Sequence, residues 1–233
     1  MRFPRNFTPF APAKEPYMYH SLENICLFSS LSKEQLKKLH QISTIKQFKE
    51  GNILFYEGEE PGYLYFLLEG LVKLYRYDAK NTITILDYYY TQALIGEAAS
   101  LQRTPYQTTA ECDTDSTILM VEYEEFAKHF LCDPDVAIQL IMQLVKKVKA
   151  LMNNRVPQTS MQKIAQLIHE NSELFTKIKK YKIASILNMA PETFSRNLKK
   201  LKKEGIIAYT SSTFEVLDAK KLCTLYDTCK TLR

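Results

Sequence analysis

The chain has 233 residues, of which 45% are hydrophobic and 24% are charged, and its formal net charge is +5. This length allows two domains, and the composition is that of an ordinary soluble globular protein. No apolar run approaches the roughly 18 to 20 residues of a membrane span, and no segment resembles a signal peptide. The sequence therefore argues against a membrane protein, and we expect a cytoplasmic location.

The cysteines are odd in number, widely spread and without a C-x-x-C pair. They are Cys26, Cys112, Cys132, Cys223 and Cys229. Such spacing argues against a disulfide framework and against a structural zinc site. We interpret them as buried or idle thiols.

Charge is distributed unevenly along the chain. Residues 45–135 carry 16 acidic and 7 basic side chains, whereas residues 142–205 carry 14 basic and 4 acidic ones. An acidic half joined to a basic half is typical of a sensor joined to a DNA-binding domain.

The first 42 residues divide into a segment without a regular period and a segment with a helical one. Residues 1–20 hold four prolines and no helix or strand period, which predicts an extension that is disordered or draped over the body. Residues 21–42 predict one or two short helices, with Ser32 as an N-cap followed by Leu36 and Leu39 at helical spacing.

From Ile45 the hydrophobic period changes to two, which is typical of β-strands. Short runs rich in aromatic and β-branched residues predict strands at 53–56, 63–68, 71–77, 82–88 and 117–121. Ile83 and Ile85 alternate with threonines, which predicts a half-buried strand. Five of the six glycines fall between these runs, so residues 21–132 predict an antiparallel sandwich or jelly roll, a fold that often encloses a ligand cavity.

A long helix is predicted from Asp133 to about Arg155, within a region that spans residues 133–156. Apolar residues with alternating spacings of four and three form a coiled-coil seam: Ala137, Ile141, Leu144, Val148 and Leu151. This seam predicts a parallel homodimer. A second stripe, Ile138, Val145 and Met152, is expected to pack back onto the β domain. A buried helix within one subunit stays open as the alternative.

The last region, residues 157–233, begins at Pro157. Helices are predicted at 161–175 and 181–187, a turn at 188–190, and a further helix from Pro191, tolerated in a first helical turn, to a glycine stop at Gly205. Two helices joined by a three-residue turn form a helix-turn-helix. Strands at 206–209 and 214–217 predict a hairpin, or wing, before a final helix at 220–233.

The helix from Pro191 has two unlike faces. Apolar Phe194, Leu198 and Leu201 can pack on a small core. The other face carries residue types that read base edges and phosphates in a DNA major groove: Glu192, Ser195, Arg196 and Lys199. An ordinary amphipathic surface helix with a solvated basic side is the alternative.

This order of parts resembles the Crp–Fnr family of bacterial transcription regulators over residues 22–222. The segments that carry the resemblance are 50–58 with 64–73, Ile95-Gly96-Glu97 with 106–110, and 191–196. The last is the most specific, because the first is shared with cyclic-nucleotide-binding domains generally. The resemblance implies an α+β fold with a β-roll sensor, a dimerisation helix and a winged helix-turn-helix, and RNA polymerase as a partner.

The recognition helix resembles the Fnr-like branch, whose pattern is Glu-x-x-Ser-Arg. It implies that Glu192 and Arg196 contact a TTGA-type half-site, and the chemistry agrees, since a carboxylate accepts from cytosine N4 and arginine binds guanine O6 and N7. Ser195 can reach a base edge or a phosphate, and Thr193 is an expected phosphate contact. Further expected phosphate neighbours are lysines: Lys182, Lys199 and Lys200.

Two positions depart from the family pattern. Asn188 stands where a glycine is common in the turn, and asparagine tolerates a left-handed backbone. Ala190 stands where Ser or Thr usually caps the helix, which loses about 1 kcal/mol. We expect DNA binding to tolerate both.

The resemblance places an effector pocket at Gly96, Glu97, Thr108 and Thr109. Members that bind cAMP carry an Arg-Ser pair there for the cyclic phosphate, whereas this chain has Gln107-Thr108-Thr109-Ala110 and no cation, which argues against cAMP. Only Cys26 precedes residue 112, which argues against an iron–sulfur cluster.

The effector itself is left open. Some relatives bind haem between the β-roll and the long helix, and the candidate axial ligands here are His20, His40 and His129, or a Met or Cys. A regulator of nitrosative stress is the first hypothesis to test, and a tyrosine-rich pocket also suits a small aromatic molecule or organic acid. A cyclic-nucleotide-binding module with no DNA role is the alternative, and no grouping of catalytic residues indicates an enzyme.

Overall fold

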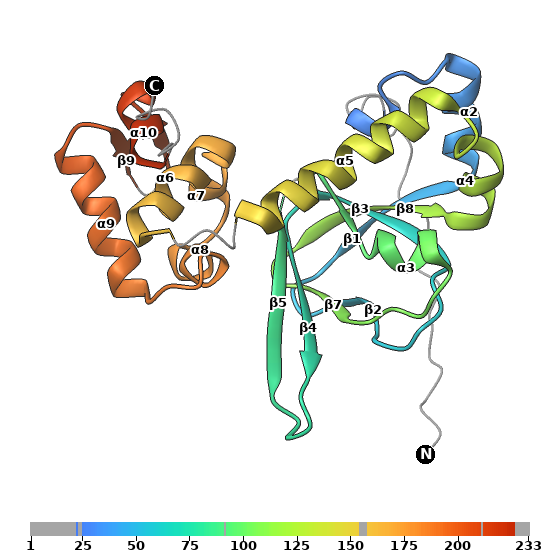
Figure 1. The fold of residues 1–233 in the computed structure, drawn as a ribbon, viewed down its shortest axis with the longest axis horizontal. Coiled ribbons are helices and arrows are strands. Elements are labelled where there is room, and N and C mark those ends of the chain that lie inside the picture. Colours follow the sequence, from blue (N-terminus) through green and yellow to red (C-terminus); the bar gives the residue numbers. More distant parts are fainter. Residues whose placement is uncertain (1–21, 23–24, 91, 154–157, 211, 227–233) are drawn as a thin grey trace.

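The computed structural model describes residues 22, 25–90, 92–153, 158–210 and 212–226. Figure 1 shows a β-rich domain and a smaller helical domain, joined at the end of the long helix α5 (Pro134–Asn153). The predicted N-terminal extension, residues 1–20, lies outside the described residues.

Short helices close one end of the β domain. They are η1 (Cys26–Phe28), α2 (Lys33–Gln41) and α4 (Tyr123–Phe130). Ser32 caps α2 as predicted, because its hydroxyl accepts from the Gln35 amide while the Gln35 side chain accepts from the Ser32 amide. Leu36 and Leu39 are buried beneath the helix. The sequence did not predict α4.

Two four-stranded antiparallel sheets form the β domain, which confirms the predicted fold class. One sheet has the order β1-β8-β3-β6 and the other β2-β7-β4-β5. Their bounds are β1 Ser43–Phe48, β2 Ile53–Phe55, β3 Tyr63–Glu69, β4 Leu71–Tyr77, β5 Ile83–Tyr90, β6 Ala93–Ile95, β7 Thr109–Cys112 and β8 Ser116–Glu122. The buried cluster between the sheets includes Phe55, Leu67, Val72 and Ile118. A short helix, α3 (Glu97–Gln102), follows β6.

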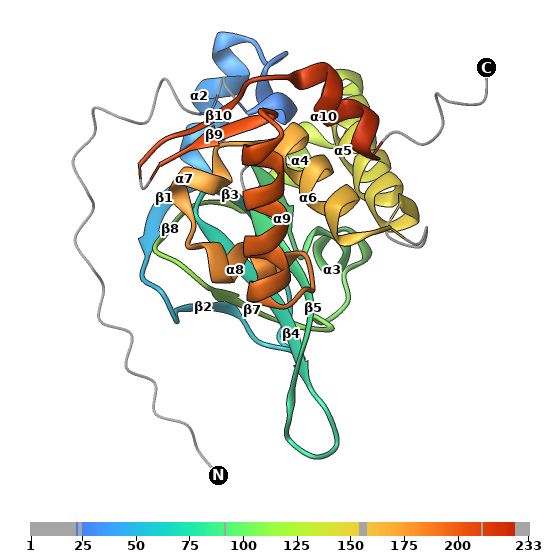
Figure 2. The same cartoon turned by 90° about the vertical axis from the view of Figure 1, so that its left-hand side faces the viewer.

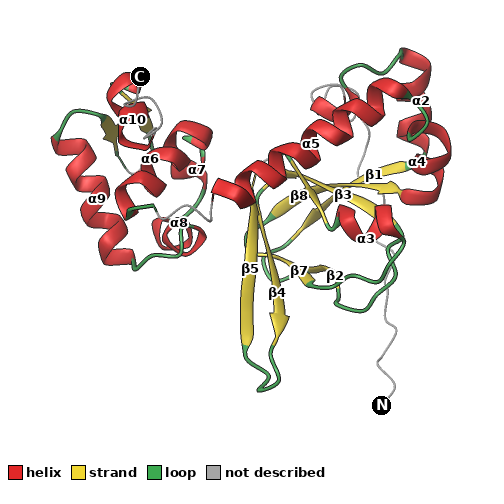
Figure 3. Ribbon diagram, in the orientation of Figure 1, coloured by secondary structure: helices red, strands yellow, loops and turns green. Residues whose placement is uncertain are grey.

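The hairpin of β4 and β5 extends as a two-stranded ribbon beyond the rest of the β domain (Figure 3). Ile83 and Ile85 are 48% and 45% exposed there, and the threonines that alternate with them are exposed as well, so the prediction of a half-buried strand was wrong. Their alternation correctly indicated a strand. Burial depends on a second sheet, however, and none of the described residues covers this end of the ribbon.

The long helix begins as predicted. The Asp133 carboxylate accepts hydrogen bonds from the amides of Asp135 (3.0 Å) and Val136 (3.3 Å), ahead of proline at the first helical position. Val136 and Leu140 pack on the β domain with the half-buried Leu144.

The predicted assignment of its two apolar stripes was wrong in part, although Ile141 and Val148 of the predicted seam are exposed. Ile138 and Val145, expected to pack inward, are 55% and 44% exposed, whereas Leu144, assigned to the dimer seam, packs inward. The exposed apolar residues of α5 are Ile138, Ile141, Met142, Val145 and Val148. Because most faces of this helix carry apolar residues, spacing alone could not choose the register. The side chains of Leu151 and Met152 lie outside the described set.

The C-terminal domain is a helix-turn-helix with a wing, as predicted. Its elements are α6 (Ser160–Asn171), α7 (Leu174–Lys177), α8 (Lys180–Ile186), α9 (Pro191–Lys203), β9 (Ile207–Tyr209), β10 (Phe214–Val216) and α10 (Ala219–Tyr226). The helix predicted at 161–175 ends at Asn171 and is followed by the separate α7. No helix in the described part of the chain is long and apolar enough to cross a membrane.

Candidate nucleic-acid interface and effector pocket

The turn before α9 has the backbone that the sequence predicts. Asn188 has a φ of +48°, in the left-handed region where asparagine can replace glycine. Ala190 occupies the N-cap without a side-chain hydrogen bond, and Pro191 begins the helix. The turn is closed by a hydrogen bond from the Met189 amide to the Ala184 carbonyl at 3.0 Å.

The inner face of α9 fixes the direction of its outer face. Phe194, Leu198 and Leu201 are at most 1% exposed and belong to the core of the C-terminal domain. The Phe175 ring lies against Phe194 and against Phe214 of the wing, with ring centroids 6.2 Å and 4.5 Å apart. Helix α9, the wing and α7 therefore share one core.

The outer face of α9 carries the predicted DNA-contacting residues. Glu192, Ser195, Arg196, Lys199 and Lys200 are exposed, and Thr193 is half-buried. Within the described residues, no hydrogen bond or ion pair engages the side chains of Glu192, Ser195 or Arg196, whereas Lys200 lies 3.9 Å from Glu204. Figure 1 shows α9 on the side of its domain away from the β domain, and Figure 2 shows it from that side.

Additional basic side chains line the wing. The Lys202 ammonium donates to the Tyr209 carbonyl at 3.0 Å. The ammonium groups of Lys180 and Lys202 lie 4.3 Å and 4.7 Å from the centroid of the Tyr209 ring. These cation–π contacts hold positive charge beside α9. These two lysines were not among the predicted site residues, because only the fold brings α8, α9 and β9 together.

Lys182 does not lie with the other predicted phosphate neighbours. Its residue is 8% exposed, and its ammonium lies 2.8 Å from the Glu50 carboxylate and 3.3 Å from the Asp113 carboxylate. Burial alone would lower the pKa of Lys182, but the two carboxylates outweigh it and raise this pKa. In this conformation Lys182 thus faces the β domain, because two acidic residues distant in sequence hold it there.

A pocket of about 300 Å³ lies in the β domain beside α3. Its lining includes three of the four predicted effector residues, Gly96, Glu97 and Thr108, together with Tyr89 and Tyr106. Thr109 is buried instead, and its hydroxyl accepts from the Glu57 amide at 3.1 Å. The volume lies at the lower end of the range for small-molecule sites.

The carboxylate in this pocket is already paired with the long helix. The Lys147 ammonium of α5 lies 2.7 Å from both Glu97 oxygens and donates to the Leu94 carbonyl at 2.6 Å. It also lies 4.6 Å from the centroid of the Tyr89 ring. Burial lowers the pKa of Lys147, although Glu97 opposes this effect. Lys147 was not among the predicted site residues, because it is fifty positions from Glu97 and looks like an ordinary helix lysine.

A second cation approaches the pocket from β4. Arg76 donates from Nε to the Gln107 carbonyl, and the same nitrogen lies 3.7 Å from the Glu57 carboxylate. Arg76 does not line the pocket, so the expectation that no cation faces the site of a cyclic phosphate stays a prediction. The arginine comes from the neighbouring strand pair rather than from this segment, so local sequence could not reveal it.

Comparison with known proteins agrees with this two-part arrangement. Residues 45–131 match the family model of the cyclic nucleotide-binding domain, and residues 159–225 match that of the Crp-like helix-turn-helix domain. The chain is homologous to the Crp–Fnr transcription regulators.

Individual relatives of this Crp–Fnr homologue are distant. The transcriptional activator protein anr of Pseudomonas aeruginosa is 21% identical over 220 residues, which cover 88% of this chain and 90% of that protein. The structure of FixK2 from Bradyrhizobium japonicum has a TM-score of 0.63 at 20% identity, covering 79% of this chain and 97% of that one, and supports the fold. The type II regulatory subunit of cAMP-dependent protein kinase from Drosophila melanogaster is 24% identical over 139 residues, and the match covers 58% of this chain and 36% of that subunit.

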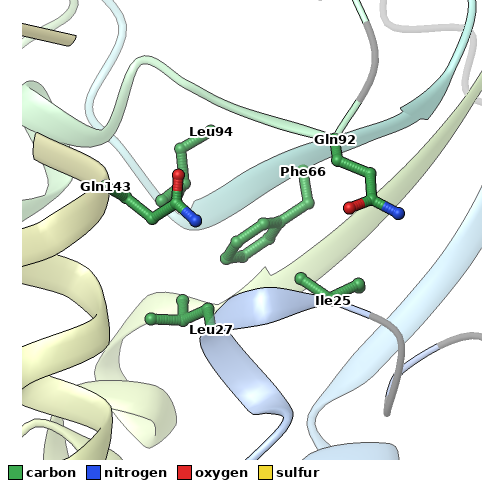
Figure 4. A pocket seen from close by; sticks show the side chains of 6 residues that line it. All are labelled: Ile25, Leu27, Phe66, Gln92, Leu94 and Gln143. Atoms are coloured by element: carbon green, nitrogen blue, oxygen red, sulfur yellow. The ribbon is translucent and has the colours of Figure 1, made fainter. Parts of the chain in front are cut away.

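Haem does not fit either of the two pockets described for this Crp–Fnr homologue. Between the β domain and α5 lies a cavity of about 20 Å³, lined by Ile25, Leu27, Phe66, Gln92, Leu94 and Gln143 (Figure 4). It has room for about one water molecule. Neither its lining nor that of the larger pocket contains His, Cys or Met. His40 and His129 lie on α2 and α4, and His20 lies outside the described residues.

The described cysteines also offer no metal site. Cys112 is buried, and burial raises the pKa of its thiol to about 11, so it behaves as an apolar core residue. Among the described residues, no three His, Cys, Asp or Glu side chains gather closely enough to hold a metal ion.

Proposed function

We propose that the chain is a homodimeric, sequence-specific DNA-binding transcription regulator that reads a TTGA-type palindrome with α9. The observation that carries the proposal is the outer face of α9, where Glu192, Ser195 and Arg196 are exposed and have no partner among the described residues. A carboxylate and a guanidinium on a rigidly packed helix are suited to cytosine and guanine edges in the major groove. Thr193, Lys199 and Lys200 then contribute phosphate contacts.

A homodimer provides the second recognition helix that a palindrome requires. In support, Ile138, Ile141, Val145 and Val148 expose apolar side chains on α5 at spacings of three, four and three. That spacing is the seam of a parallel coiled coil. We assign residues 21–132 to the sensor, 133–156 to dimerisation and 157–233 to DNA binding, and RNA polymerase is the partner that such a regulator contacts.

We assign effector binding to the pocket of about 300 Å³ that Gly96, Glu97 and Thr108 line. Its lining combines tyrosines with uncharged polar side chains, and its one carboxylate is neutralised by Lys147. A small, uncharged organic molecule suits this lining better than an anion does. Binding next to the Lys147–Glu97 pair would bias the position of α5 and hence the spacing of the recognition helices.

The test is a gel-shift titration with a TTGA-type palindrome and a scrambled duplex of the same composition. We expect the wild-type protein to prefer the palindrome, and Arg196→Ala to weaken that complex by about 1 to 3 kcal/mol. Lys203→Ala, which removes a positive charge from the last turn of the same helix, is the matched control and should change affinity for both duplexes alike. Equal affinity of wild type and Arg196→Ala for the palindrome would refute the assignment.

A cyclic-nucleotide-binding module is a second candidate function, favoured by the match of residues 45–131 to the cyclic nucleotide-binding domain. Arg76, which contacts the Gln107 carbonyl, is the cation nearest the segment where a cyclic phosphate would be expected. Calorimetric titration with cAMP and cGMP tests it. Saturable heat that Arg76→Gln abolishes would favour this function, and heats equal to those of dilution would exclude it.

A further inference from the structure

The helix-turn-helix and the β domain meet at a charged contact centred on Lys182 of α8. The Lys182 side chain is 10% exposed, and its ammonium contacts Glu50 before β2 and both the carboxylate and the carbonyl of Asp113 after β7. The hydrogen bond from Lys182 is the largest cause that lowers the pKa of the Glu50 carboxyl. A lysine of the DNA-binding domain is thus held by two carboxylates of the sensor domain.

The acidic receptor is built into the β domain. The Asp113 carboxylate also lies 3.5 Å from Lys73 of β4, whose ammonium is 2.8 Å from Glu111. The Asp113 amide donates to the Leu71 carbonyl at 2.7 Å, and the Leu71 amide donates to the Thr114 hydroxyl at 2.9 Å. These bonds hold the loop and its carboxylate through contacts that do not involve Lys182.

Apolar contact surrounds the ion pairs. Leu71 at the start of β4 is fully buried and belongs to the same cluster as the core of the helix-turn-helix, and Tyr88 and Tyr90 of β5 pack against that cluster. Nearby, Lys177 of α7 lies 4.0 Å from Glu69. The contact therefore continues from Glu50 and Asp113 over the ends of β3, β4 and β5, and it involves both α7 and α8, so it is more than one surface ion pair.

We propose that the acidic site formed by Glu50 and Asp113 is a docking site for the chain's own helix-turn-helix, and that it competes with DNA for Lys182. The proposal rests on the DNA-binding function proposed above. One ammonium cannot lie against two carboxylates and a phosphate at once, and the carboxylates repel a phosphate backbone that approaches α8. DNA binds better to the released state, so the docked state lowers the apparent affinity for DNA by the fraction of molecules that occupy it.

The first experiment measures docking without DNA. Reductive methylation of the full chain is followed residue by residue by mass spectrometry, with exposed Lys199 as the internal reference. We expect Lys182 to react at least several-fold more slowly than Lys199 in wild type, and to approach the rate of Lys199 in Glu50→Gln/Asp113→Asn. Equal rates of Lys182 and Lys199 in wild type, or protection that survives in the double variant, would overturn the docking site.

The second experiment measures competition with DNA by gel shift. Glu50→Gln/Asp113→Asn should bind the palindrome about three- to fivefold more tightly than wild type, the range expected for loss of partly exposed ion pairs. Glu60→Gln/Glu124→Gln makes the same change in net charge elsewhere on the β domain and is the matched control. If both double variants gain equally, the gain is general electrostatics and the competition is overturned.

The two proposals fail separately. Protection of Lys182 that is lost in Glu50→Gln/Asp113→Asn, combined with no DNA binding by any variant, would support the docking site and refute the proposed function. Specific DNA binding with an unprotected Lys182 would support the proposed function and refute the docking site.

Discussion

The outer face of α9 and the pocket beside α3 differ in whether their charged side chains have partners within the described residues. On α9, Glu192 and Arg196 are exposed and have no partner among the described residues. In the pocket, Glu97 is 7% exposed and both of its oxygens are bonded to Lys147. The first surface has polar groups directed at solvent and available to an external partner. In the second, Lys147 of α5 already neutralises the carboxylate, so the pocket offers a ligand no unpaired charge.

The two regions also differ in how far the sequence could predict them. The two faces of α9 follow from the order of residues within one helix, and the structure places Phe194, Leu198 and Leu201 inside as predicted. The pairing of Glu97 with Lys147 joins residues fifty positions apart, and no local pattern carries that information. The prediction of which side of α5 faces the β domain failed for the same reason, because Val136 and Leu140 pack in one cluster with residues of η1 and β3.

The largest expected effect comes from breaking the internally paired site. Lys147→Met leaves the buried Glu97 carboxylate without its cation, and we expect the free energy of unfolding to fall by about 3 to 5 kcal/mol. Urea denaturation followed by circular dichroism measures it. Lys146→Met, at the exposed neighbouring position, should stay within about 0.5 kcal/mol of wild type. Adding Glu97→Gln to Lys147→Met should recover much of the loss, and no recovery would contradict the pairing.

The second largest effect is expected at the exposed apolar seam of α5. Like the outer face of α9, this seam has no partner among the described residues. Ile141 is 56% exposed, and Ile141→Glu would place an unpaired charge in each half of the proposed dimer interface. We expect the dissociation constant to rise roughly 100-fold, or about 2.7 kcal/mol. Analytical ultracentrifugation measures it. Leu86→Glu, an equally drastic change on the β4–β5 hairpin, is the control, and equal dissociation in both variants would place the interface elsewhere.

Two residues of α9 should separate a base contact from a phosphate contact. Glu192→Ala should reduce discrimination between the TTGA-type palindrome and a variant at one base pair by about 1 to 3 kcal/mol. Lys199→Ala should instead weaken binding to all duplexes and reduce the slope of log affinity against log salt by about 1. Gel shifts at several salt concentrations separate the two. A uniform loss in Glu192→Ala would assign that residue to the backbone.

The smallest expected effect lies at Asp133, whose carboxylate is held by hydrogen bonds within the chain. Its bonds to the next turn of α5 were predictable, because they join neighbouring residues of one helix, whereas the bond from Gln35 of α2 was not. Hydrogen bonds from the Val136 amide and then from the Gln35 side chain hold the pKa of this carboxyl below its usual value of 3.8. A carboxyl whose pKa is lower in the folded state stabilises the protein above its unfolded pKa, and this contribution disappears as pH falls through the folded pKa. Asp133→Asn keeps a cap but removes the titration, so its difference in melting temperature from wild type should shrink between about pH 6 and about pH 3. Thermal melts across that range test this. Asp135→Asn, in the same first turn, is the matched control, and a difference that stays constant in Asp133→Asn would show that the carboxylate charge does not stabilise the start of α5.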